Sequence, residues 1–249
     1  MTARRLAAEF LGTAGLLLAI VGSGITAASD GAASAQLMQH AIVVGAALAA
    51  LILTFGPISG AHFNPAVTVV DAVFGGVQWR MAAGYVGAQL AGAICGVMAT
   101  NLLFGRSVIE IAATERTGLA AATSESVATF GLLIVIFGVV RSGRTDAVPA
   151  AVGVWIAGAI YFTPSASFAN PAVTVGRMLS DTYTGIAPSG VPGFLAGQLI
   201  GAAGASVVIG WLFRAGADTA RDVVVPHPGD ASDERPDARH VAGKASPTP

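Results

Sequence analysis

One hexapeptide, Asn-Pro-Ala-Val-Thr-Val, occurs twice in this chain, at Asn64–Val69 and at Asn170–Val175. An identical segment repeated about half a chain length apart indicates that the protein is built from two copies of one unit. Asn is a favoured N-cap residue and Pro is tolerated at the first helical position, so each copy predicts a helix that begins at its Asn-Pro. Apolar sequence surrounds both copies. The chain must therefore start two helices inside apolar surroundings.

The composition places those surroundings in a membrane. Hydrophobic residues make up 54% of the chain and charged residues only 11%, with a mean hydropathy of +0.71, whereas a soluble domain has about 25% charged residues. The net charge of −1 argues against a nucleic-acid partner. The single Cys95 cannot form an internal disulfide, and no metal-ligand spacing or nucleophile–base pairing is present. We therefore expect no enzyme, no metal and no cofactor.

Six apolar stretches are long enough, at about 20 residues each, to cross a hydrocarbon core. They lie near 7–27, 38–58, 80–104, 125–141, 147–163 and 192–213. Two shorter stretches, 64–74 and 170–179, begin at the repeated Asn-Pro and are too short to cross. A helix that starts at membrane depth is tolerated only where its unpaired backbone groups line a cavity. The sequence therefore predicts an all-α membrane protein with six transmembrane helices and two re-entrant half-helices around a pore.

Basic residues near the ends of the spans predict how the chain is oriented. They precede the first span, follow the sixth, and lie in the linkers after the second and the fourth: Arg4, Arg5, Arg80, Arg141, Arg144 and Arg214. Both termini are expected on the cytoplasmic side of the inner (plasma) membrane. Residues 1–213 are expected to form a single transmembrane channel domain. Residues 214–249, rich in Asp, Arg, Pro and His, are expected to form a disordered cytoplasmic tail.

The internal repeat extends beyond the hexapeptide. Glu9 and the residues after it match Glu125 and the residues after it at a constant offset. Each half of the chain, 7–104 and 125–213, holds three spans, so the second half enters the membrane from the opposite side. The two halves are therefore inverted repeats about an axis in the membrane plane, as in many transporters and channels.

The residues around the first copy, Ser59–Thr68, and the opening of the first span, Ala8–Thr13, resemble the aquaporin (major intrinsic protein) family. The resemblance covers about residues 7–213. It implies a six-helix bundle whose half-helices meet at mid-membrane, assembled as a homotetramer with one pore per subunit. It also implies that both motifs face the pore, through Asn64, Pro65, Ala66, Asn170, Pro171 and Ala172. Two helix N-termini would there present positive dipole ends and Asn N–H groups, so that neutral hydroxyl-bearing solutes pass and cations do not.

Four other polar residues lie near the motifs or at the starts of spans. The symmetric placement of Glu9 and Glu125, together with the resemblance, favours a buried structural role in which each carboxylate binds re-entrant loop backbone. His62 is interpreted as a structural loop residue near the pore wall. Asp71 is expected to end the first half-helix at the aqueous edge.

The chain departs from the family pattern after the second motif. Members usually have Arg there, whereas this chain has Val173. Counting from the two Asn residues as in the family places the rest of the constriction on Val44, Gly158 and Ser167. This ring has no charge and no large side chain, so we expect a wide and apolar opening. Arg177 lies one helical turn beyond Val173 and is expected in the outer vestibule.

A wide apolar ring favours weakly hydrated neutral solutes over ions and water, because shedding water against apolar walls costs most for strongly hydrated species. Glycerol-sized polyols, urea and trihydroxy metalloid acids fit this description. The segments 163–169 and 181–188 resemble bacterial aquaglyceroporins associated with arsenic resistance, which implies passage of arsenite. Four alternatives remain: a water-selective channel, a glycerol or urea facilitator with no metalloid role, an ion-coupled secondary transporter, and a structural or adhesive protein whose pore Val44 and Val173 close by dewetting. The transporter would need protonatable or ion-coordinating groups at mid-membrane, and neither motif has one.

Overall fold

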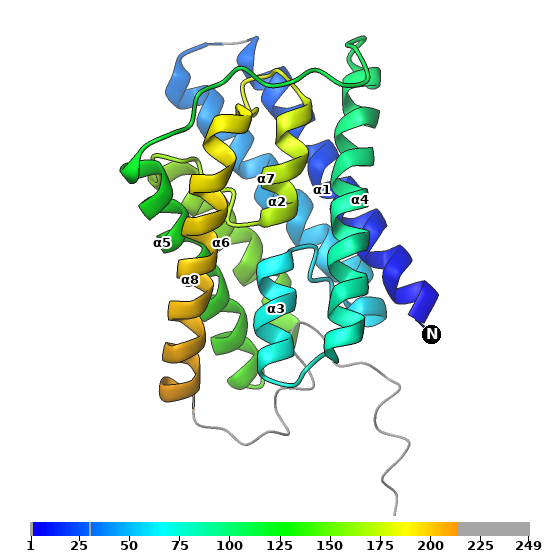
Figure 1. The fold of residues 1–249 in the computed structure, drawn as a ribbon, viewed down its shortest axis with the longest axis vertical. Coiled ribbons are helices and arrows are strands. Elements are labelled where there is room, and N and C mark those ends of the chain that lie inside the picture. Colours follow the sequence, from blue (N-terminus) through cyan, green and yellow to red (C-terminus); the bar gives the residue numbers. More distant parts are fainter. Residues whose placement is uncertain (1, 30, 214–249) are drawn as a thin grey trace, which may run out of the picture.

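The computed structural model describes residues 2–29 and 31–213, and these residues contain helices but no strand (Figure 1). Six helices in the described part are long and apolar enough to cross a membrane. They are α1 (Thr2–Ala28), α2 (Ala33–Ser59), α4 (Trp79–Leu103), α5 (Leu119–Arg141), α6 (Val148–Phe162) and α8 (Val191–Leu212). The two short helices that follow the Asn-Pro motifs are α3 (Pro65–Val73) and α7 (Pro171–Gly176). The predicted fold class is thus confirmed.

The boundaries of several elements differ from those predicted. The first helix begins at Thr2 rather than near residue 7, and α5 begins at Leu119 rather than near 125, because a helix can extend past the hydrocarbon into polar sequence. The second half-helix is shorter than expected: α7 ends at Gly176 and continues as a 3₁₀ turn, η2 (Arg177–Leu179). Further 3₁₀ turns precede α6 and α8, namely η1 (Thr145–Ala147) and η3 (Pro188–Gly190). The predicted tail, 214–249, lies outside the described residues.

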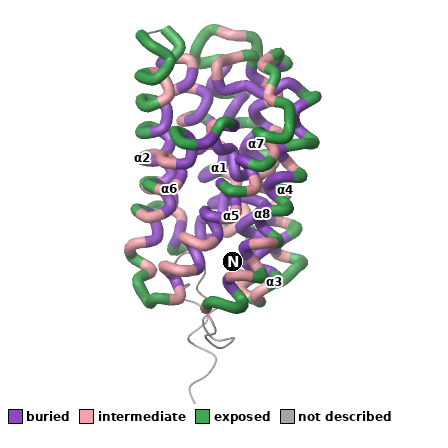
Figure 2. The backbone as a smooth tube through the Cα atoms, turned by 90° about the vertical axis from the view of Figure 1, so that its left-hand side faces the viewer, coloured by how far each residue is buried: buried purple, intermediate pink, exposed green. Residues whose placement is uncertain are grey.

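The two halves of the chain repeat the same arrangement of helices. The pair α1 and α4 in the first half corresponds to α5 and α8 in the second, and α3 and α7 occupy the lower and upper parts of the bundle in Figure 1. Buried residues lie inside the bundle, and exposed residues cover its outer surface and ends (Figure 2). Many exposed residues are large and apolar, such as Val154 at 74% and Val207 at 73% exposure. A lipid environment accounts for such a surface.

Glycines allow the matched helix pairs to approach closely. A Cβ atom on Gly92 would lie 2.3 Å from the backbone oxygen of Phe10, and one on Gly201 would lie 2.3 Å from the backbone oxygen of Ser126. Real Cβ atoms do not come this near to another backbone. Small residues at helix crossings are what packing in lipid requires, and the repeat uses them at equivalent places in both halves.

Candidate functional site: a pore where the two half-helices meet

Two strained loops lead into the half-helices. Five non-glycine residues in them have left-handed backbone conformations, with φ angles between 38° and 56°: Ala61, Phe63, Ala166, Ser167 and Ala169. Each such residue costs about 1–2 kcal/mol relative to an ordinary conformation. Such conformations persist only where the surroundings hold them in place.

Glu9 holds the first loop from within α1. Its fully buried carboxylate accepts hydrogen bonds from the backbone N–H groups of His62 (3.0 Å) and Phe63 (2.7 Å), from the Ser59 hydroxyl (2.6 Å) and from the Gln89 amide (2.7 Å). Four hydrogen bonds satisfy a charge that would otherwise be very costly at this depth. The carboxylate thus connects α1 and α4 to the loop backbone.

Glu125 repeats this arrangement in the second half. Its carboxylate accepts from the backbone N–H groups of Phe168 (2.9 Å) and Ala169 (2.8 Å) and from the amide of Gln198 (2.7 Å). The same Gln198 amide donates to the Thr174 hydroxyl on α7 at 2.9 Å. The inverted repeat therefore builds two equivalent supports beneath the two loops.

The two motif Asn residues cap their own helices and join the opposite loops. The Oδ1 atom of Asn64 accepts from the N–H of Ala66, and that of Asn170 accepts from the N–H of Ala172, both at 2.9 Å. The Nδ2 atom of Asn64 donates to the Ala169 carbonyl at 2.7 Å. The Nδ2 atom of Asn170 donates to the Phe63 carbonyl at 2.8 Å. Each amide has a second N–H with no further partner among the described residues, and that N–H is available to a passing solute.

A cavity of about 50 Å³ lies where the two half-helices meet, with room for a few water-sized molecules. Both motif Asn residues line it. The rest of the lining is mostly apolar. Helices α2 and α6 contribute apolar residues spaced by four, on one face of each helix: Val44, Leu48, Ile52, Val152, Ile156 and Ile160.

Of the four residues assigned to the constriction, three line the cavity: Val44, Ser167 and Val173. Gly158 does not, and a Cβ atom at this position would lie 3.7 Å from the Phe162 ring. The α6 residues on the lining are Ile156 and Ile160, on either side of Gly158. The assignment of Gly158 to the constriction, obtained by counting from the motif, is therefore wrong for this cavity, because the rotation of α6 turns Gly158 away from it.

Two charged residues near the motifs are almost completely buried. Arg177 is 3% exposed and lines the cavity. Asp71 is 2% exposed, so it does not end its helix at an aqueous edge. Its Oδ2 atom lies 3.6 Å from Nε2 of His62, a lining residue, while its Oδ1 atom has no hydrogen-bond partner. Packing against neighbouring helices buries Asp71, which hydropathy along one helix does not reveal.

His40 on α2 is a lining residue that the sequence analysis did not single out. It lies four residues before Val44, hence on the same face of α2 and one turn away. This spacing was the signal that would have identified it. The side chain is 2% exposed.

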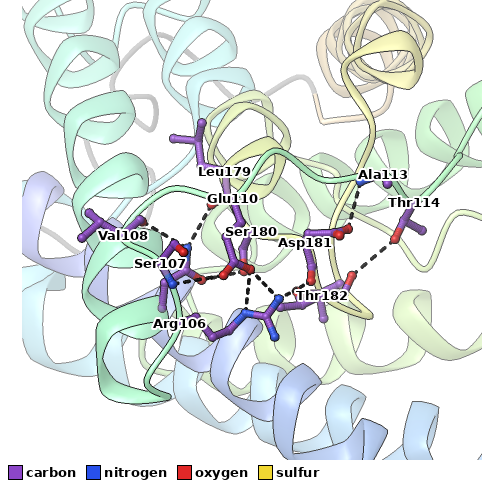
Figure 3. A network of polar contacts seen from close by, with 12 residues as sticks. Arg106, Ser107, Val108, Glu110, Ala113, Thr114, Leu179, Ser180, Asp181 and Thr182 are labelled. Atoms are coloured by element: carbon purple, nitrogen blue, oxygen red, sulfur yellow. Dashed lines mark hydrogen bonds and ion pairs between the residues drawn. The ribbon is translucent and has the colours of Figure 1, made fainter.

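The loop between α4 and α5, residues 104–118, crosses the upper end of the bundle (Figure 1). There it binds the segment after α7 (Figure 3). Arg106 donates to the Asp181 carbonyl at 2.7 Å, and the backbone N–H of Ala113 donates to the Asp181 carboxylate at 2.9 Å. Arg116 donates to the carbonyls of Gly185 (2.8 Å) and Tyr183 (2.9 Å). Burial lowers the pKa of the Arg116 guanidinium, which nevertheless stays charged. These contacts fix the backbone that surrounds Arg177.

Two half-helices meeting at a narrow cavity within six membrane-spanning helices define a membrane channel. The family profile described as major intrinsic protein matches residues 1–167. The chain belongs to this family, whose members are passive channels for small solutes.

Individual relatives agree with this assignment. Aquaglyceroporin AqpS of Rhizobium meliloti (strain 1021) is 45% identical over 212 residues, which cover 85% of this chain and 91% of the relative. Aquaporin NIP1-1 of Zea mays is 35% identical over 195 residues, covering 74% and 67%. The X-ray structure of the aquaglyceroporin from Plasmodium falciparum matches with a TM-score of 0.66 at 23% identity, covering 86% of this chain and 96% of that chain. This structural likeness supports the fold.

Proposed function

We propose that this channel conducts small neutral hydroxylated solutes, with arsenite and related metalloid acids first and glycerol second. The observation that carries the proposal is Val173 on the cavity lining, where the family pattern has Arg. Val44 lies on the same lining and Ser167 adds only a small hydroxyl. The similarity to a protein named aquaglyceroporin supports solutes larger than water.

The proposed mechanism follows from the cost of dehydration. A small ion or a water molecule loses strong hydration when it passes apolar walls, whereas a weakly hydrated neutral solute loses less. At the centre, the free N–H groups of Asn64 and Asn170 replace part of the lost hydration. Both helix N-termini point positive dipole ends at this place, so cations are repelled.

We further propose a homotetramer in the inner (plasma) membrane with both termini in the cytoplasm. The distribution of Arg residues near the span ends supports this orientation. On this assignment α3 lies in the cytoplasmic half and α7 in the outer half of the bundle. Residues 1–213 then form the channel domain.

The test uses purified protein in liposomes, with arsenite, glycerol and water permeability measured by light scattering on one preparation. Val173→Arg should lower arsenite and glycerol permeability about tenfold, which corresponds to about 1.4 kcal/mol, while water permeability changes less than about twofold. Val173→Leu is the matched control, because it adds bulk without charge.

Three outcomes separate the possibilities. Equal loss of all three permeants in a variant that elutes normally on size exclusion would show that Val173 does not discriminate between them. If the wild type conducts glycerol but not arsenite, the metalloid part of the proposal is wrong and the protein is a glycerol facilitator. Fast water passage with no solute passage would contradict the proposed selectivity.

A further inference from the structure

Arg177 presents hydrogen-bond donors to the cavity. Its Nε atom donates to the Thr184 carbonyl, and its guanidinium lies over the Phe168 ring with Cζ 3.4 Å from the ring centroid. These two contacts hold the side chain in one position. Its two terminal nitrogens have no hydrogen-bond partner among the described residues, and the residue lines the cavity. A buried guanidinium held this way offers its remaining N–H groups to whatever occupies the cavity.

His40 presents a second polar group from α2. Its Nδ1 atom lies 2.8 Å from the Ser23 hydroxyl, which in turn donates to the Ile20 carbonyl at 3.2 Å. Because a hydroxyl has one proton, Ser23 then accepts from Nδ1–H of the histidine, and this tautomer leaves Nε2 as an acceptor. Nε2 has no partner among the described residues. The edge of the Tyr183 ring, with centroids 6.2 Å apart, keeps the imidazole in place.

Both residues lie one helical turn away from the apolar ring, toward the same mouth. His40 precedes Val44 by four residues on α2, which starts at the upper end, and Arg177 follows Val173 by four residues, in the 3₁₀ turn η2 that continues α7 toward that end (Figure 1). The His40 ring packs against Tyr183, and Arg177 donates to the carbonyl of the next residue, Thr184, so one short segment of the loop contacts both side chains. The two side chains therefore belong to one level of the cavity, outside the level of the valines.

The inverted repeat shows that this placement is a regular feature of the fold. Arg177 is the seventh residue after its motif Asn, as Asp71 is after the other. The ring next to each of these residues is also equivalent. Phe168, which contacts Arg177, lies two residues before Asn170, and His62, which lies beside Asp71, lies two residues before Asn64. Each half thus places one buried ionisable residue against a ring that lines the cavity, a basic residue in one half and an acidic residue in the other.

We propose that Arg177 and His40 form a polar filter displaced one turn outward from the apolar ring. This inference rests on the proposed function and names its recognition chemistry. The filter selects neutral solutes that can accept a hydrogen bond from Arg177 and donate one to Nε2 of His40 at the same time. Polyols and trihydroxy acids have both groups. The guanidinium also repels cations before they reach the motif Asn residues.

The first experiment compares His40→Leu with His40→Gln in liposomes. Leu is similar in size but has no polar group, whereas the Gln amide restores one. His40→Leu should lower the ratio of glycerol to water permeability about fivefold. This change corresponds to the loss of one hydrogen bond worth about 1 kcal/mol. His40→Gln should stay within about twofold of the wild type. Unchanged or increased glycerol passage in His40→Leu would overturn the proposal, because His40 would then only fill space.

The second experiment tests the charge through potassium leakage from the same liposomes. Arg177→Leu should raise the leakage about tenfold, since it removes a charge whose barrier to a cation exceeds about 1.4 kcal/mol. Arg80→Leu, the same change at an exposed position outside the cavity, is the control and should leak as the wild type does. Normal size-exclusion elution and retained water permeability show that the variant is folded. Tight exclusion of potassium by folded Arg177→Leu would overturn the proposal.

The two proposals fail in different ways. If the wild type conducts neither glycerol nor arsenite, the proposed function is wrong, while potassium leakage through Arg177→Leu still tests the filter. If Val173→Arg behaves as proposed but the His40 and Arg177 variants behave as the wild type, only the displaced filter is wrong.

Discussion

Replacing Glu125 by Gln tests whether its carboxylate supports the pore loop. The carboxylate accepts three hydrogen bonds, two of them on Oε2. A Gln oxygen can take over the Oε2 position, but its NH₂ group then faces the N–H of Phe168, and two donors cannot pair. The substitution removes one charge-assisted bond, and the two that remain become neutral.

The magnitude follows from these contacts. The lost charge-assisted bond is worth about 1.5–3 kcal/mol, and each remaining bond weakens by about 1 kcal/mol. The free energy of unfolding should therefore fall by about 4 kcal/mol. For a chain of this length that lowers the melting temperature by about 10 °C. Solute permeability should fall as well, because the loop loses its contact at Phe168, while the contact at Ala169 weakens, where the backbone is strained and the carbonyl accepts from Asn64.

Thermal unfolding of the detergent-solubilised protein gives the stability change, and liposome flux gives the functional one. Glu115→Gln is the matched control, since Glu115 is exposed and its melting temperature should shift by less than about 2 °C. If Glu125→Gln were equally silent in both assays, the group at position 125 would be bound as a neutral acid, and the charge-assisted argument would fail.

Two further substitutions test the packing and the buried charge. Gly92→Ala places a Cβ atom 2.3 Å from the backbone oxygen of Phe10 and should lower both the melting temperature and the yield of folded protein. Gly87→Ala on the same helix is the control, because its Cβ atom meets nothing within 4 Å and the change should be neutral or slightly stabilising. Equal behaviour of the two variants would show that α1 and α4 do not pack this closely. Asp71→Leu should lower thermal stability by about 3 kcal/mol, because it removes the buried carboxylate whose Oδ2 atom lies 3.6 Å from Nε2 of His62; raised stability would show instead that the cost of burying the unpartnered Oδ1 atom outweighs this contact.

The class of protein, the number of spans and the positions of the two half-helices could be predicted from the order of residues along the chain. These properties are local: a run of about 20 apolar residues is long enough to span a membrane, and Asn-Pro followed by apolar residues favours a helix that begins at the Pro. The repeated Glu9 and Glu125 also follow from the sequence, because equal spacing in the two halves points to an equal role.

Which side chains line the pore depends on how the helices pack against one another. A shift of two residues turns a side chain by about 200° around a helix, so Gly158 and Ile156 face different ways although they are close in sequence. The rotation of α6 that decides between them depends on contacts with α2, which is far away along the chain, and with the preceding helix α5. The burial of Asp71, Arg177 and His40 has the same origin, because neighbouring helices and the loop over the upper mouth enclose positions that hydropathy along one helix cannot distinguish.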